Sequence, residues 1–244
     1  SGRQLKTEIQ SAIDGDRISL LAQKVVSISD HEVLHVELLS SLTGAGGDEI
    51  PARIFVPIGS QYGLLAALDI KVIERAFAAL EGVHTLPWTV SVNVSMQSIG
   101  DDGFRAALLD VLGRNHHLAW RLVVEITGLA ASRLPELVKA FASDLRRMGA
   151  HIAIDNFDVN KDAMAIVHEL LPTYVKLSPS FIKEITARED LRFIVAALVR
   201  MLQPLNIPLI AQGVEDQSAI LILAGLGVDG YQGYAAGRPE PLPG

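Results

Sequence analysis

The sequence predicts an α/β fold of the (β/α)8 type, a closed barrel of eight strands surrounded by helices. The chain has 244 residues, close to the ~250 that are typical of one such barrel. Short apolar runs alternate with longer runs of helical spacing, which indicates βα units and a parallel sheet. Polar residues recur at the C-terminal ends of the strands, where barrels of this kind build their sites.

The strands are expected where short apolar, β-rich runs end in turn residues. Ser29 and Asp30 lie between the first two runs and predict a hairpin, so the barrel is expected to contain an antiparallel strand near its start. The expected strands are Ile18–Val26, Val33–Leu39, Thr89–Val94, Leu122–Ile126, Ile152–Ile154, Tyr174–Leu177, Pro208–Ala211 and Val228–Tyr231.

The helices are expected where apolar residues recur every three or four positions, as Leu65, Leu68, Val72 and Ala76 do. No glycine-rich phosphate loop follows the first strand, which disfavours an open dinucleotide-binding sheet. The expected helices are Leu64–Leu80, Asp101–Arg114, Leu134–Met148, Ala163–Leu171, Leu191–Leu202 and Gln217–Ala224.

Composition excludes several classes of protein. The net charge of −7 argues against a non-specific DNA or RNA binder, which needs a broad basic surface. There is no cysteine, so disulfides, thiolate metal sites and cysteine nucleophiles are excluded. No apolar run reaches the ~18 residues of a membrane span. We interpret residues 1–244 as one domain, and the opening Ser1-Gly2 without a methionine leads us to expect that it was cut from a longer protein.

Seven polar residues close the predicted strands. Each alone is explained by a helix cap, a solvated loop or a satisfied core group, but seven around one barrel mouth predict a site, because clustered carboxylates are unfavourable without partners. Carboxylate and amide oxygens suit Mg²⁺, Mn²⁺ or Ca²⁺, whereas the lack of histidine disfavours zinc. A lysine among them could hold a phosphate or orient a water. The seven are Glu37, Asn93, Glu125, Asp155, Lys176, Gln212 and Gln232.

Eight short motifs occur in the order and spacing of the EAL domain family, the cyclic di-GMP phosphodiesterases and receptors. The chain resembles this family from roughly Leu20 to Pro241. The resemblance implies the EAL variety of the TIM-type barrel and a place in bacterial second-messenger signalling. The motifs are VELLS (36–40), FVPIGSQYGLLAALDIKVIERA (55–76), SVNVS (91–95), VVEITG (123–128), IAIDNF (152–157), YVKLS (174–178), IAQGVE (210–215) and, with a longer spacing than the family's, GYQGYAAGRP (230–239).

The resemblance assigns roles residue by residue. It implies that Lys176 and Gln232 lie near the attacking water as remnants of the catalytic set. It implies first-metal ligands at Glu37, Asn93, Glu125 and Asp155. It implies cyclic di-GMP contacts at Gln23, Leu38, Leu39, Ser60, Asn93, Lys176, Gln212, Glu215 and Gln232.

Several family residues are replaced. Ser41 stands for the arginine that grips a phosphate, Ser60 for a glutamate, and residues 156–164 read NFDVNKDAM instead of DFGTGYSSL. Losing anionic ligands weakens the hold on a divalent ion, and a neutral amide is no general base near pH 7. We therefore expect Mg²⁺ or Mn²⁺ at one residual site and no second metal. The replaced acidic positions are Asn156, Ser178, Gln212 and Gly128.

Three hypotheses follow from this pattern of kept and lost residues. The first is a degenerate EAL domain that binds cyclic di-GMP as a receptor or signalling module with little or no hydrolysis. The second is a weak, metal-dependent cyclic di-GMP phosphodiesterase, and the third is a nucleotide-free protein-interaction domain. The resemblance implies a cytoplasmic domain linked to GGDEF or sensor domains, and it leaves open a membrane-anchored parent in the inner membrane, a homodimer and a protein partner.

Overall fold

The computed structural model describes residues 2–82, 89–159 and 163–242. Eight strands form a closed barrel in the order β1-β9-β8-β7-β6-β5-β4-β2, and pairing between β1 and β2 closes it. This confirms the barrel that the sequence predicts. The strands are β1 (Ile18–Ser27), β2 (Val33–Thr43), β4 (Val90–Asn93), β5 (Leu122–Thr127), β6 (His151–Phe157), β7 (Val175–Leu177), β8 (Leu209–Ala211) and β9 (Gly230–Tyr231).

The first strand runs against its neighbours, as the hairpin signal predicts. β1 is antiparallel to both β2 and β9, whereas the strands from β2 through β4 to β9 pair in parallel. In this register Gln23 lies opposite Glu37, which lies in the middle of β2 and not near its end as expected, because β2 continues to Thr43. Two short strands extend the sheet, β3 (Glu49–Ile50) beside β2 and β10 (Glu240–Pro241) beside β1.

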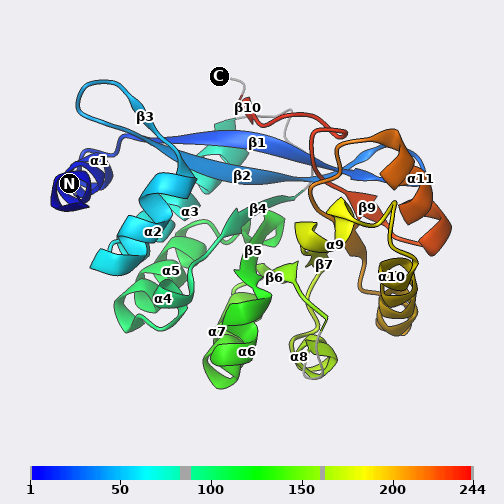
Figure 1. Ribbon diagram of the computed structural model, residues 1–244. Coiled ribbons are helices and arrows are strands. Elements are labelled where there is room, and N and C mark those ends of the chain that lie inside the picture. The colour runs from blue at the N-terminus through cyan, green and yellow to red at the C-terminus, as the bar shows by residue number, and fades with distance from the viewer. Residues whose placement is uncertain (1, 83–88, 160–162, 243–244) are drawn as a thin grey trace.

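Helices lie around the outside of the barrel, while the long ribbons of β1 and β2 run along one side of it, at the top of the view (Figure 1). The six helices expected from the sequence are α3 (Leu65–Gly82), α5 (Asp102–Arg114), α7 (Pro135–Arg147), α8 (Ala163–Leu170), α10 (Glu189–Leu202) and α11 (Gln217–Leu226). Five helices were not expected, namely α1 (Gly2–Asp14), α2 (Ala52–Tyr62), α4 (Met96–Ile99), α6 (Gly128–Arg133) and α9 (Pro179–Lys183).

The three unexpected short helices α4, α6 and α9 follow strands, and each begins with a local start signal. Ser95 and Thr127 accept hydrogen bonds from backbone N–H groups in the first turns of α4 and α6. Pro179 begins α9, where its missing N–H costs no hydrogen bond. Helices of four to six residues show little of the helical periodicity on which sequence prediction depends.

The apolar side chains form two cores. The larger one lies between the barrel and its helices, and the smaller one contains Val25, Val123, Ala153, Tyr174 and Ile210. Four of these lie in barrel strands and Tyr174 lies directly before β7, and four of the five lie two residues before a predicted strand-end polar residue. Because side chains alternate along a strand, this small core lies inside the barrel and forms the floor of the strand-end site.

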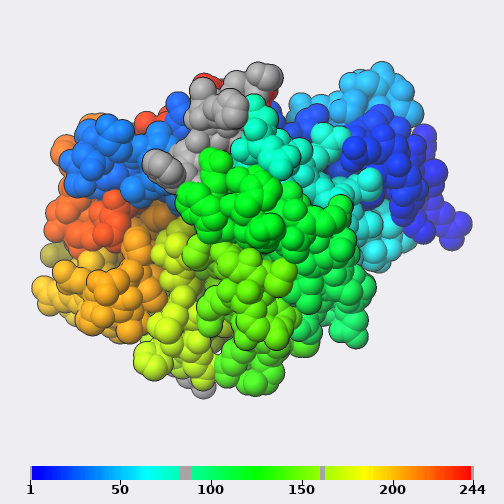
Figure 2. Space-filling view, turned by 180° about the vertical axis from the view of Figure 1, so that it is seen from behind, coloured from blue at the N-terminus to red at the C-terminus, as the bar shows by residue number. Residues whose placement is uncertain are grey.

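Seen from behind, the outer surface follows the order of the chain. The middle of the chain occupies the centre of this face, between the N-terminal segment on one side and the C-terminal helices on the other (Figure 2). Among the described residues, no helix has the length and apolar character needed to cross a bilayer.

Candidate functional site at the strand ends

Lys176 lies at the centre of the strand-end cluster and is fully buried. Its Nζ donates to Glu37 Oε2 at 2.7 Å and to Glu125 Oε2 at 2.8 Å. Glu37 also accepts from Gln232 Nε2 at 2.7 Å and from Asn93 Nδ2 at 2.6 Å. Five of the predicted strand-end residues are therefore joined in one hydrogen-bonded network.

Burial and charge act in opposite directions on this network. Burial lowers the pKa of Lys176, but the carboxylates of Glu125, Glu37 and Asp155 outweigh it, so this pKa lies above its usual value. Burial raises the pKa of Glu37, yet the ammonium of Lys176 and the surrounding donors bring it below normal. At Glu125 burial is the larger effect and raises the pKa, while the positive charge of Lys176 lowers it by less. The ammonium is thus held in its charged form by paired carboxylates.

Asp155 lies beside this network and is paired with an amide. Gln212 Nε2 donates to Asp155 Oδ1 at 2.7 Å. The register between β6 and β7 shifts between Ile154 and Phe157, and Asn156 has a φ of 48°, so the strand bulges where Asp155 lies. Burial raises the pKa of Asp155, the ammonium of Lys176 opposes this, and the charge of Glu37 adds to it.

The predicted metal ligands lie together, but their oxygens are engaged by donors of the protein itself. The Nζ of Lys176 joins Glu37 and Glu125, two of the four predicted metal ligands. Within residues 2–82, 89–159 and 163–242, no three acidic or histidine side chains are arranged to hold a metal ion. In this arrangement the cluster does not fit a divalent ion, although its oxygens are of the type that Mg²⁺ and Mn²⁺ prefer.

A pocket of about 340 Å³ opens above the cluster. Five of the predicted ligand contacts line it, together with Glu37: Gln23, Leu39, Gln212, Glu215 and Gln232. Four lining residues were not predicted from the sequence: Pro179, Gly213, Gly233 and Tyr234.

The other predicted contacts lie elsewhere. Leu38 is 1% exposed in the hydrophobic core, because it points to the side of β2 opposite to Glu37 and Leu39. Ser60 is exposed on α2, where its carbonyl accepts from Gln97. Asn93 and Lys176 belong to the hydrogen-bonded network and do not line the pocket.

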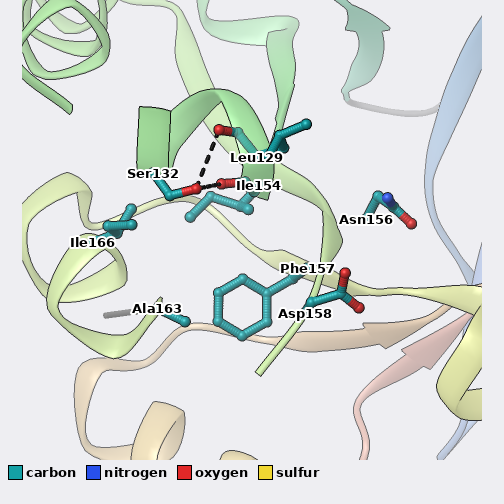
Figure 3. Close-up of a pocket in the computed structure, with 9 residues that line it drawn as sticks. Leu129, Ser132, Ile154, Asn156, Phe157, Asp158, Ala163 and Ile166 are labelled. Carbon is teal, nitrogen blue, oxygen red and sulfur yellow. Dashed lines mark hydrogen bonds between the residues drawn. The ribbon is translucent and has the colours of Figure 1, made fainter. Parts of the chain in front are cut away.

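The four positions where the resemblance expects acids, Gly128, Asn156, Ser178 and Gln212, lie at or directly after the C-terminal ends of β5, β6, β7 and β8. Ser178 is buried, and its hydroxyl lies 3.0 Å from that of Ser180. Gly128 and Asn156 line a second pocket of about 220 Å³ between α6, β6 and α8, with Asp158 at its edge (Figure 3). Residues 160–162 of the altered loop lie outside the described residues.

Ser41, which stands in place of the family's arginine, is buried in β2 opposite Ser19.

Two aromatic side chains support the cluster from the barrel interior and were missed by the sequence analysis. The hydroxyl of Tyr174 donates to Glu125 Oε1 at 2.7 Å. The ring of His35 stacks on Tyr174 with centroids 4.5 Å apart. His35 and Tyr174 lie two residues before Glu37 and Lys176, so strand alternation was the signal that places them on the same face.

A third support fixes the turn after β4. Asp69 on α3 accepts from the backbone N–H of Ser95 at 2.8 Å and from the hydroxyl of Ser98 at 2.6 Å. Burial raises the pKa of Asp69, and the two serines oppose this. This carboxylate anchors the segment that follows Asn93, and nothing in the periodicity of α3 marks it.

The fold and the site define a TIM-type barrel with an antiparallel first strand and a polar site at its strand ends. The EAL domain model matches residues 6–239, and the chain therefore belongs to the EAL domain family. It is similar to the cyclic di-GMP phosphodiesterase PdeF of Escherichia coli, with 25% identity over 98% of this chain and 32% of PdeF. The chain thus spans about a third of the length of that curated relative.

Solved structures agree in fold. One is the PaMucR phosphodiesterase in complex with c-di-GMP, with a TM-score of 0.87 and 26% identity over 98% of both chains. Another is Vibrio cholerae LapD S helix-GGDEF-EAL bound to c-di-GMP, with a TM-score of 0.89 and 26% identity over 96% of this chain and 57% of that chain.

Proposed function

We propose that this EAL domain binds cyclic di-GMP and acts as a receptor or signalling module with little or no hydrolysis. Two of the similar structures are named as complexes with c-di-GMP. The pocket of about 340 Å³ lies over the strand-end cluster and is lined by five of the side chains expected to contact the ligand. These observations support ligand binding at the barrel mouth.

The hydrogen bond between Gln212 and Asp155 is the main observation that supports the proposed loss of hydrolysis. An amide N–H donates to the carboxylate at 2.7 Å, where an acidic residue would leave it free for a cation. A glutamine cannot take up a proton near pH 7, so it cannot serve as a general base. Lys176 is held between Glu37 and Glu125, so its ammonium offsets one of the carboxylate charges of the cluster. We infer that ligand binding needs no metal.

The first test is a calorimetric titration of cyclic di-GMP into the domain, once in EDTA and once with Mg²⁺ or Mn²⁺. Chromatography afterwards shows whether the ligand is intact. We expect binding in both buffers and recovery of intact cyclic di-GMP. A linear dinucleotide product that disappears in Glu37→Ala would instead favour the weak phosphodiesterase. No heat in either buffer would favour a nucleotide-free interaction domain.

A substitution at Gln212 tests the metal argument directly. Gln212→Glu places a second carboxylate against Asp155, and like charges at this distance repel unless a cation lies between them. We expect the melting temperature of this variant to rise on adding Mn²⁺ by several degrees more than that of the wild type. Gln217→Glu, at an exposed position on α11, is the matched control for added charge. Equal shifts in both variants would contradict the argument.

The lengths of the relatives suggest the context of the domain. The chain spans 32% of PdeF and 57% of the LapD chain, whose name includes a GGDEF region. We propose that this domain occupies the cytoplasmic part of a longer signalling protein, next to a GGDEF or sensor domain. A full-length gene sequence checks this directly.

A further inference from the structure

The pocket above the cluster lacks a cation of its own. Its described lining residues include the carboxylates of Glu37 and Glu215 but no lysine or arginine. Lys176 is fully buried and forms ion pairs with two carboxylates. Its positive charge is therefore compensated within the cluster and attracts a ligand in the pocket only weakly. A ligand with two phosphodiester groups carries two negative charges and needs positive charge at the rim. Ser41, which stands in place of the family's phosphate-binding arginine, supplies no positive charge.

Arg238 is held over one of the lining residues. Its guanidinium carbon lies 4.7 Å from the ring centroid of Tyr234, within the range of a cation–π contact. Tyr234 lines the pocket and yet is 58% exposed, so its ring is open to an incoming ligand. An exposed aromatic ring at the edge of a pocket offers a flat apolar surface on which a base can stack.

The backbone holds this segment rigidly. Val214 donates to the carbonyl of Gln232 at 3.0 Å, and its own carbonyl accepts from Ala235 at 3.0 Å. Gly233 has a φ of 142°, and a Cβ there would overlap the backbone of Val214. The backbone at Tyr234 is therefore held beside the loop that follows β8, which reduces the entropy that binding must remove when a base stacks on the ring.

We propose that Tyr234 and Arg238 form the base-and-phosphate subsite at the rim of the pocket. The phenol ring stacks on one purine base of the ligand, and the guanidinium supplies the positive charge that the pocket lining lacks. This inference rests on the proposed function and gives a role to two residues of the last family motif, GYQGYAAGRP (230–239), to which the family resemblance assigned none. Tyr234 determines the fit of the base, and Arg238 determines the attraction of the anion.

The test is calorimetric titration of cyclic di-GMP in EDTA with matched variants. Stacking of a base on an aromatic residue predicts that Tyr234→Ala weakens binding at least about tenfold, whereas Tyr234→Phe stays within about twofold. Arg238→Ala should weaken binding severalfold and flatten its dependence on salt concentration, because one screened attraction is lost.

A second cation–π pair supplies the control. Lys6 Nζ lies 5.0 Å from the ring centroid of Tyr62, and Tyr62 does not line the pocket. Tyr62→Ala removes the same kind of pair and should leave the affinity unchanged. If the wild type binds and both Tyr234→Ala and Arg238→Ala stay within twofold of it, the subsite is overturned while the proposed function stands. If the wild type itself does not bind, the proposed function fails first.

Discussion

Lys176 and Glu37 are 139 residues apart in the sequence, and their side chains meet at 2.7 Å between Nζ and Oε2. Glu125 shares the same ammonium group at 2.8 Å. The side chains of Lys176 and Glu125 are inaccessible to solvent, and that of Glu37 is 7% exposed. When one member of a buried ion pair is removed, the remaining charge loses its partner in a poorly solvated place. The stability of the barrel mouth therefore depends on one lysine.

Replacement of that lysine by an apolar residue of similar length should be strongly destabilising. For Lys176→Met we expect the free energy of unfolding to fall by about 3–5 kcal/mol, as for other broken buried pairs. Urea denaturation followed by circular dichroism measures it. Added Mn²⁺ should restore part of the loss, because the vacated carboxylates are suitable oxygen ligands.

The matched control is Lys139→Met. Lys139 bridges Glu136 and Glu169 on the surface, where solvent screening leaves an ion pair with little effect on stability. Equal losses in the two variants would show that the buried cluster has no special role in stability.

The hydroxyl of Tyr174 should matter separately from its ring. Tyr174→Phe keeps the stacking on His35 but removes the donor to Glu125 Oε1. Loss of a hydrogen bond that leaves a buried carboxyl oxygen without its partner predicts a decrease of about 1–3 kcal/mol in unfolding free energy. Thermal and urea unfolding of the purified variant test this. Tyr62→Phe serves as the control at a site away from the cluster, and a loss of the same size there would contradict the argument.

The barrel was predictable because its signals are local and repeated. Each strand combines an apolar run with a polar residue at its end, and parallel strands bring their C-terminal ends to one mouth. The hairpin of β1 and β2 was predictable from Ser29 and Asp30. Helices α1 and α2 were not expected; α2 contains Pro57 within it, which weakens the helical signal.

The members of the site were predictable, but their partners were not. Sequence order places Lys176, Glu37 and Glu125 at one mouth, yet it does not say that the ammonium bridges both carboxylates. Side chains alternate along a strand, which explains why Leu38, next to Glu37, lies in the core. Matching the sequence motif VELLS does not show which of its residues face the site and which face the core. Tyr234 follows a tight backbone contact that only the folded chain reveals.

Asp69 predicts a pH dependence of stability that is independent of the strand-end cluster. Burial raises its pKa above the ordinary 3.8, so the folded state holds this proton more tightly than the unfolded state. The contribution of Asp69 to the free energy of unfolding is therefore most favourable below 3.8, the pKa of this group in the unfolded chain. It is lost as the pH rises from about 3.8 through the higher pKa of the folded state.

Asp69→Asn should remove this pH dependence while keeping an oxygen acceptor for Ser95 and Ser98. We expect the variant to gain stability relative to the wild type as pH rises above 4, measured by urea unfolding between pH 4 and 7. Asp69→Ala loses both hydrogen bonds and should be less stable by about 1–3 kcal/mol throughout this range. A constant difference between wild type and Asp69→Asn across this range would refute the assignment.

Two glycines near the mouth predict opposite responses to the same substitution. A Cβ at Gly128 would meet Phe157 Cα at 3.5 Å and the carbonyl of Asn156 at 3.6 Å, which are ordinary contacts, and it would partly fill the pocket of Figure 3. Gly128→Ala should therefore raise the unfolding free energy by about 0.4–1 kcal/mol, because the unfolded chain loses conformational freedom.

Gly233→Ala forces a Cβ into the backbone of Val214 at positive φ and should lower the unfolding free energy by more than about 1 kcal/mol. Urea denaturation of the two variants distinguishes these outcomes, and a destabilised Gly128→Ala would mean that the start of α6 needs glycine for reasons other than space.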